Sequence, residues 1–180
     1  MRRALIRHPD TPCEAVAGLV VEAHRPSPAR LALRYTLQGE LGALRIPPRT
    51  EPKRTDGLWR RTCFEAFLRA DASAAYHELN FAPSSEWAAY GFNAYRAGMT
   101  LADATPRIEA FAETGDTLVV TAAIDLGAGL AEAKWYLALA AVIEERTGRL
   151  SYWALAHPPG KPDFHHKDAF TLEIRGASAS

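Results

Sequence analysis

The stretch YLALAAVIEE, residues 136–145, decides between a helical and a strand interpretation for this half of the chain. Alanine-rich segments have high helix propensity, which on its own favours a helix over residues 126–141. However, Leu137, Leu139 and Ile143 alternate with smaller apolar residues, which is typical of a strand buried on both faces in the middle of a sandwich. We therefore predict a strand over residues 136–145, preceded by a short helical turn at residues 130–134.

The same pattern continues on both sides of this stretch. Short apolar or alternating runs are separated by turn residues at intervals of about ten, which indicates a β-sandwich or a barrel. Glycines at positions 39, 115 and 148 lie between such runs, where tight hairpins need a positive φ. The sequence thus predicts an all-β fold with at most one or two short helical turns. The predicted strands are residues 15–23, 30–37, 44–46, 58–68, 76–81, 87–95, 107–113, 117–125, 136–145, 149–155 and 169–175.

Length and charge limit the possible classes of protein. The 180 residues fit one domain, which we assign to residues 1–180 with a frayed tail at 176–180. Apolar residues make up 48% and charged residues 23%, a balance that excludes disordered, collagenous and coiled-coil chains. The 21 Lys and Arg residues match the 21 Asp and Glu residues, so there is no excess positive charge to bind nucleic acid.

The sequence also indicates a compartment. Arg7, His8 and Asp10 interrupt the N-terminal segment before an export signal develops, and no apolar run approaches the roughly 18–20 residues of a membrane span. We expect a cytoplasmic protein with no membrane partner. Cys13 and Cys63 lack a CxxC partner, so neither a zinc site nor a disulfide framework is predicted.

Polar residues are predicted to gather on one face of a hairpin. Alternate residues of a strand share a face, so a core face at Phe64 leaves Arg61 and Glu65 on the other side. The next predicted strand places Glu78 and Asn80 on one face, and pairing of the two strands brings these four polar residues together. A solvated sheet face with cross-strand Arg–Glu pairs is the alternative interpretation.

Aromatic residues lie on or beside these two strands, namely Trp59, Tyr76, Trp87, Tyr90, Tyr95, Tyr152 and Trp153. Flat rings beside a few converging carboxylate, amide and guanidinium groups suit a sugar or another polyol, although each Trp taken alone also fits the core. We therefore predict a ligand-binding face.

A stiff loop at residues 157–168 forms a second candidate site, because it combines three prolines and a glycine with three histidines. One of the adjacent His165 and His166 could join His157 or Asp163 at a metal ion, which would make this loop the centre of a metalloprotein or a metal-dependent enzyme. The alternative is one buried, hydrogen-bonded His that locks the loop. No nucleophile-elbow, dinucleotide or P-loop motif occurs, so we assign no catalytic and no metal-binding residue. Glu65 and Glu78 remain open as a glycosidase acid–base pair.

Two runs carry a family resemblance: DGLWRRTCFEAFL at 56–68 and YHELNFAPSSEWAAY at 76–90. They resemble the DOMON-like domains, a superfamily that includes the family-nine carbohydrate-binding modules, whose pattern has a Trp, an acidic residue in an apolar strand, and Tyr-x-Glu-x-x-x-x-Pro. The ending from YWALAHP at 152–158 to Phe170 looks like that of an uncharacterised bacterial branch of this superfamily. The resemblance matches Trp59, Glu65 and Glu78 to the motif, and Trp153 to a second aromatic platform.

The resemblance implies a β-sandwich of two antiparallel sheets, as in a carbohydrate-binding-module-like jelly roll. Together with the polar strand face and its aromatic neighbours, it leads us to expect non-catalytic binding of a carbohydrate-like small molecule without a cofactor. His157 or His165 would shape the rim of the site. Other DOMON domains bind haem through Met with His or Lys, so Met99 and His157 form a second possibility. A protein-interaction module that uses a sheet edge or residues 47–57 is a third.

Overall fold

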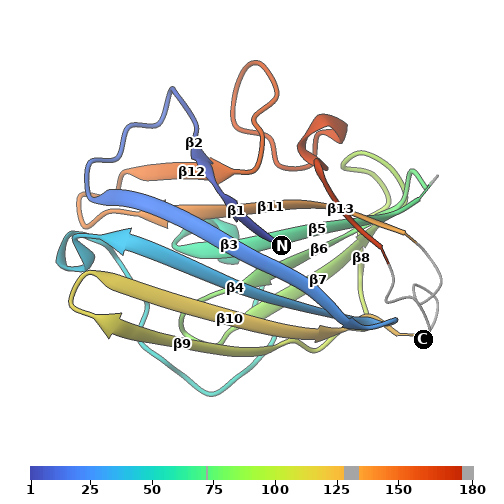
Figure 1. Cartoon of the computed structure of the whole chain (residues 1–180), viewed down its shortest axis with the longest axis horizontal. Coiled ribbons are helices and arrows are strands. Elements are labelled where there is room, and N and C mark those ends of the chain that lie inside the picture. Colours follow the sequence, from blue (N-terminus) through green and yellow to red (C-terminus); the bar gives the residue numbers. More distant parts are fainter. Residues whose placement is uncertain (72, 128–133, 176–180) are drawn as a thin grey trace.

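Two antiparallel sheets pack face to face in the computed structural model, which describes residues 1–71, 73–127 and 134–175 (Figure 1). The five-stranded sheet has the order β1-β3-β4-β10-β9 and lies in front in this view. Its strands are β1 (Arg2–Ala4), β3 (Val16–Ser27), β4 (Arg30–Gly39), β9 (Arg107–Thr114) and β10 (Thr117–Asp125). The predicted all-β sandwich is confirmed.

The second sheet has eight strands and carries the features discussed below. Its order is β2-β12-β11-β5-β6-β7-β8, and β13 pairs with the other end of β11, beyond β12. Its strands are β2 (Ile6–Arg7), β5 (Cys63–Ala70), β6 (Tyr76–Phe81), β7 (Trp87–Phe92), β8 (Thr100–Leu101), β11 (Trp135–Glu144), β12 (Leu150–Ala154) and β13 (Leu172–Ile174). Among the described residues, no helix is long and apolar enough to cross a membrane.

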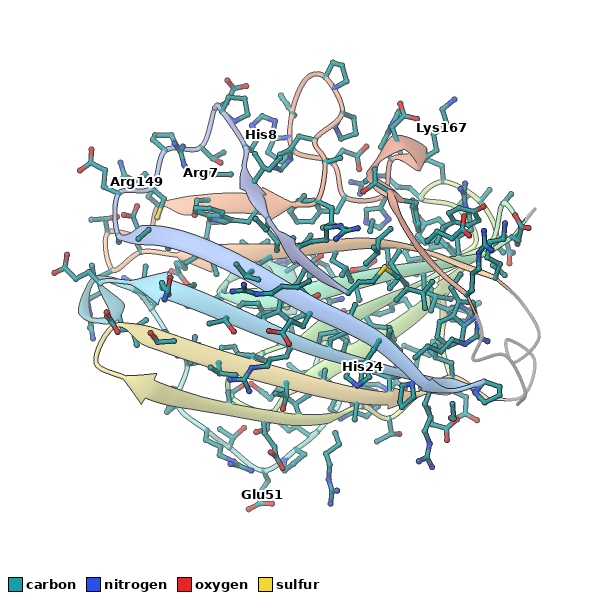
Figure 2. All side chains as sticks on the ribbon, viewed as in Figure 1. Arg7, His8, His24, Glu51, Arg149 and Lys167 are labelled. Carbon is teal, nitrogen blue, oxygen red and sulfur yellow. The ribbon has the colours of Figure 1, made fainter. Side chains whose placement is uncertain are left out.

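Alternation along the strands fills the space between the sheets. In β5, Phe64, Ala66 and Leu68 are fully buried in the core between the sheets, as predicted. The strand β11 is buried along almost its whole length, which confirms a strand rather than a helix in this stretch. Figure 2 shows side chains packed between the two sheets, whereas the labelled Glu51, Arg149 and Lys167 project outward.

The predicted helical turns and several strand ends need correction. The described residues contain three 3₁₀ turns instead of one or two: η1 (Leu41–Ala43), η2 (Leu58–Arg60) and η4 (Lys167–Ala169). The segment predicted as a strand at 58–68 begins with η2, because Gly57 adopts φ 76° and turns the chain before the strand. Residues 44–46 contribute only an isolated bridge at Leu44. The turn predicted at 130–134 falls mostly on residues 128–133, outside the described residues.

A short N-terminal segment connects the edges of both sheets. The strand β1 pairs with β3 in one sheet, and β2 pairs with β12 in the other, with the buried Leu5 between them. Two histidines fix this segment: His8 Nε2 donates to the Gly160 carbonyl at 3.0 Å, and His157 Nε2 donates to the Ile6 carbonyl at 2.7 Å. The segment therefore also holds the 155–171 loop, which connects β12 to β13.

Candidate functional site

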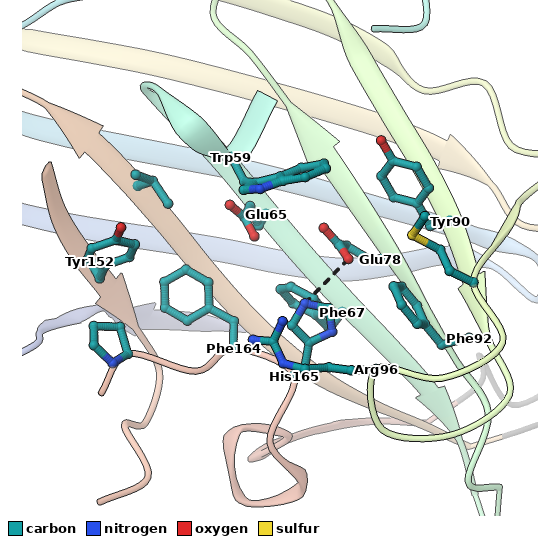
Figure 3. Close-up of a pocket in the computed structure, with 13 residues that line it drawn as sticks. Trp59, Glu65, Phe67, Glu78, Tyr90, Phe92, Arg96, Tyr152, Phe164 and His165 are labelled. Carbon is teal, nitrogen blue, oxygen red and sulfur yellow. Dashed lines mark ion pairs between the residues drawn. The ribbon is translucent and has the colours of Figure 1, made fainter. Parts of the chain in front are cut away.

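A cavity of 460 Å³ lies on the outer face of the eight-stranded sheet, which faces away from the five-stranded sheet (Figure 3). Its volume falls within the range of small-molecule sites, about 300–1,000 Å³. Strands β5, β6, β7, β11 and β12 form its floor, and η2, the 93–99 loop and the 155–171 loop form its walls. The lining residues are Trp59, Glu65, Phe67, Glu78, Tyr90, Phe92, Arg96, Met99, Val142, Tyr152, Pro162, Phe164 and His165.

The register of the sheet sets the floor of the cavity. Phe67 of β5 lies directly opposite Glu78 of β6, and Glu78 lies opposite Tyr90 of β7. On the other side of β5, Ala140 of β11 lies opposite Glu65. Because Ala140 has a small side chain, the sheet leaves space above Glu65 while the larger neighbours rise around it.

Glu65 is a buried carboxyl group on this floor. The residue is 2% exposed, and its Oε1 atom has no hydrogen-bond partner among the described residues. Burial, and secondarily the nearby charge of Glu78, raise the pKa of Glu65 well above its ordinary value. An unsatisfied buried oxygen is costly, so a ligand that donates a hydrogen bond to Oε1 gains affinity.

Glu78 is the second buried carboxyl group and, unlike Glu65 Oε1, its Oε1 atom accepts a hydrogen bond. Asn80 Nδ2 donates to Glu78 Oε1 at 2.9 Å, and Cys63 Sγ lies 3.7 Å from Asn80 Oδ1 as a weak donor. Burial raises the pKa of Glu78, while the Asn80 hydrogen bond and the charge of Arg96 partly offset this rise. Figure 3 shows the two carboxyl groups next to each other beneath Trp59.

Trp59 forms one wall of the cavity, where it is positioned by the turn at Gly57 and by contact with Tyr90 of β7. Gly57 adopts a left-handed conformation before η2 and turns the chain over the sheet. Tyr90 Oη donates a short hydrogen bond to Asp56 Oδ1, and the rings of Tyr90 and Trp59 meet edge to face at 6.0 Å. Burial and this hydrogen bond raise the pKa of Tyr90, so the phenol stays protonated and can donate.

The opposite wall is held together by Asp163. Its carboxylate accepts hydrogen bonds from Tyr95 Oη at 2.6 Å, Arg96 Nη2 at 2.9 Å and the backbone N–H of His165 at 3.1 Å. These contacts join the 93–99 loop to the 155–171 loop. Arg96 itself has a positive φ of 51°, which fits its place in the tight turn between Ala94 and Ala97.

His165 packs over the floor in a neutral form. Its ring lies edge to face on Phe67 at 4.9 Å, and burial, together with the charge of Arg96, lowers its pKa to about 4. Tyr76 Oη accepts from Arg96 N at 3.1 Å and donates to His165 Nδ1 at 2.8 Å. The ring proton is then on Nε2, which lies 3.6 Å from Glu78 Oε2. At neutral pH this contact joins an uncharged imidazole to a carboxyl group.

The structure brings together half of the residues that the sequence predicted for the site. Trp59, Glu65, Glu78 and His165 line the cavity. Asn80 is fully buried behind them and supports Glu78.

The other three predicted residues lie elsewhere. The Arg61 side chain is 71% exposed and lies 3.9 Å from Glu144, because it precedes the first residue of β5 and so departs from the strand alternation. Trp153 packs in the core between the sheets, where its Nε1 donates to Ser151 Oγ at 3.0 Å. His157 binds the Ile6 carbonyl and stacks edge to face on His8 at 4.9 Å. Trp153 therefore cannot serve as a second aromatic platform of this cavity.

Several residues that line the cavity were not predicted from the sequence. Phe67 shares the outer face of β5 with Glu65, and Tyr90 of β7 lies opposite Glu78. Phe164 and Arg96 reach the cavity from loops. The sequence feature that best indicates such a residue is the alternation of Phe67 with the core residues of β5, which places its side chain on the outer face of the sheet.

The chemistry of the described residues gives no support to a metal or haem site. No group of three or more His, Cys, Asp or Glu side chains in the described part of the chain is placed to hold a metal ion. Met99 lines the cavity but His157 does not, so this pair does not face a common site.

Replacing Asp163 by Asn is expected to loosen the wall formed by the two loops. The Asn side chain keeps its size but loses the charge that binds Arg96, so the free energy of unfolding should fall by about 1 kcal/mol at neutral pH. Because Asp163 has a lowered pKa, this difference should disappear as the wild-type carboxylate becomes protonated in acid. Urea unfolding at several pH values measures both effects. Asp168→Asn, at an exposed contact with His166, is the matched control and should change little.

The fold has solved counterparts, although no protein-family model and no curated protein sequence matches the chain. A protein from Bacteroides uniformis ATCC 8492, described as a candidate carbohydrate-binding protein, superposes with a TM-score of 0.68 at 12% identity and covers 97% of this chain and 85% of that one. A family-nine carbohydrate-binding module from Caldicellulosiruptor kristjanssonii, in complex with glucose, gives a TM-score of 0.52 at 12% identity and covers 98% and 86%. The chain therefore has the same sandwich fold as these proteins.

Proposed function

We propose that the cavity binds a carbohydrate or a carbohydrate-like small molecule and that the chain is a non-catalytic binding protein. The observation that carries the proposal is the buried Oε1 of Glu65, which finds no hydrogen-bond partner in the described part of the chain and lies at the floor of a cavity lined by aromatic rings. Sugars combine C–H faces, which pack on rings, with hydroxyl groups, which donate to carboxylates. Trp59 supplies a half-buried ring, and Glu65 with Glu78 supplies the acceptors.

The two structural counterparts support the same ligand class. One is described as a candidate carbohydrate-binding protein, and the other as a module in complex with glucose. We further propose that the chain is related to the DOMON-like domains and works in the cytoplasm on a small sugar. The cavity volume of 460 Å³ suits such a ligand.

Replacing Trp59 by Ala is expected to weaken sugar binding by about tenfold, since the loss of a stacked ring and its buried area costs about 1–2 kcal/mol. A glycan array of monosaccharides and disaccharides identifies the best sugar, and calorimetry on the purified protein then gives its affinity for wild type and variant.

The matched control is Arg61→Ala, which removes a large side chain next to η2 but outside the cavity. This variant should bind the same sugar with wild-type affinity. The proposal fails if no sugar binds at millimolar concentration, or if Trp59→Ala binds as well as Arg61→Ala.

A further inference from the structure

The charges that line the cavity do not balance. Glu65 and Glu78 lie on the floor, and Arg96 is the one Lys or Arg among the lining residues. Its guanidinium donates to Asp163 at 2.9 Å, so its charge is largely compensated by that carboxylate. His165 is neutral at physiological pH because its pKa is lowered to about 4.

Glu65 has no cationic partner among the described residues. No Lys, Arg or His nitrogen in that part of the chain lies within 4.0 Å of its carboxylate. The ionisable groups that interact electrostatically with it are Glu78, the Cys63 thiol and the Tyr35 phenol, none of which carries a positive charge. Around Glu78, the Asp56 carboxylate adds negative potential and Arg96 offsets part of it.

The walls around this acidic floor are aromatic. Trp59, Tyr90 and Phe92 stand on one side, and Tyr152 and Phe164 on the other (Figure 3). The faces of such rings carry partial negative charge and attract ammonium groups. Rings above a pair of carboxylates thus favour a cation over a neutral group.

The number of available acceptors also favours an ammonium group. Within residues 1–71, 73–127 and 134–175, Glu65 Oε1 lacks a hydrogen-bond partner and Glu78 Oε2 has only the long contact to His165. A hydroxyl group has one proton to donate, whereas a protonated primary amine has three and can serve both carboxylates at once. Hydrogen bonds between charged groups are also about twice as strong as neutral ones.

We propose, on the basis of the proposed function, that the sugar bound in this cavity carries a protonated amino group held between the Glu65 and Glu78 carboxylates. The ligand class is then a hexosamine with a free amine. The amine enters first and reaches the floor, while the rest of the ring packs against Trp59.

Three matched pairs of sugars test this inference: glucose with glucosamine, galactose with galactosamine, and mannose with mannosamine. Calorimetry at about pH 7 should show at least one amino sugar bound about tenfold more tightly than its parent sugar. N-acetylglucosamine, which lacks the charge, should lose this advantage. Because the ammonium stabilises ionised carboxylates, binding should also release protons, which calorimetry in buffers of different ionisation enthalpy detects.

Conservative variants test whether the two carboxyl groups cause the preference for the amino sugar. Glu65→Gln and Glu78→Gln keep the side-chain shape but remove the charge, so each should reduce the preference for the amine while the protein stays folded by circular dichroism. Glu109→Gln, on an exposed position of β9 in the other sheet, should keep the preference.

The outcomes separate this inference from the proposed function. Equal affinity for the amino sugars and their parents, or tight binding of N-acetylglucosamine, would overturn the inference and leave sugar binding in place. An unchanged preference in both Gln variants would also overturn it. If none of these sugars and no sugar of the glycan array binds, the proposed function and the inference both fail.

Discussion

Replacing Phe67 by Ala is expected to lower the free energy of unfolding by about 3–5 kcal/mol and to detach the 155–171 loop. Phe67 is 1% exposed and contacts the rings of Tyr76, Phe164 and His165. Phe164 and His165 of the loop pack against the Phe67 ring, so removal of this ring leaves a void between the loop and the sheet. Urea unfolding measures the stability, and hydrogen exchange of the loop amides measures its attachment.

Phe64→Ala is the matched control, because Phe64 lies three residues earlier in β5 and is equally buried between the sheets. It should cost a similar free energy of unfolding but leave exchange of the 155–171 loop close to wild type under native conditions. If both variants expose the loop to the same extent, Phe67 has no special role in holding it. Milder Phe→Leu variants permit the same comparison if either Ala variant fails to fold.

Replacing Glu65 by Gln is expected to stabilise the protein at neutral pH by about 1–3 kcal/mol, because the variant lacks a carboxyl group that the unfolded chain ionises more readily than the folded chain. Burial raises the pKa of Glu65 in the folded state well above 4.5, its ordinary value. Below that ordinary value the carboxyl is protonated in both folded and unfolded chains, so it costs no stability. As the pH rises from there toward the folded-state pKa, the unfolded chain loses this proton while the folded chain keeps it, so the free energy of unfolding falls. The difference between variant and wild type should therefore be small in acid and grow toward neutral pH.

Other groups titrate over the same pH range. The informative quantity is therefore the difference in the free energy of unfolding between Glu65→Gln and wild type, and not the pH dependence of either protein alone. His77, His157 and His165 have lowered pKa values and cost stability as the pH falls below about 6.5. They are present in both proteins and cancel in the difference. Thermal or urea unfolding at a series of pH values gives this difference. A stabilisation independent of pH would show that Glu65 is not the titrating group, and a destabilised variant would show that its carboxyl is satisfied.

The floor of the site was more predictable than its walls. Alternation in β5 and β6, with a short turn between them, was enough to place Glu65, Glu78 and Asn80 on one face, because the side-chain period of a strand is two. This rule ends where the strand ends, so Arg61 was misplaced. Trp153 was misplaced for a related reason: alternation separates it from Tyr152, but only the pairing of Trp153 with Ala141 shows which of the two faces the core.

The walls depend on contacts between distant parts of the chain. Asp163 binds Arg96, 67 residues away, and His157 binds the Ile6 carbonyl, 151 residues away. No local pattern specifies such partners, because loop conformations lack the periodicity of strands. The sequence could therefore predict a hydrogen-bonded His in the 157–168 loop, but not that His157, His165 and His166 all make hydrogen bonds or that His165 is the one that lines the cavity.

The N-terminal segment that joins both sheets has a consequence for synthesis on the ribosome. The strand β1 can pair with β3 soon after both emerge, but β2 must wait for β12, whose register joins Arg7 to Trp153. Until then the edge of β2 is open and can pair with another chain. Bringing β2 and β12 together is slow, because the chain between them loses conformational entropy before the contacts between the two strands form. The 155–171 loop is held to residues 6 and 8 by His157 and His8, so the cavity that it walls can form only after both of these segments have been synthesised.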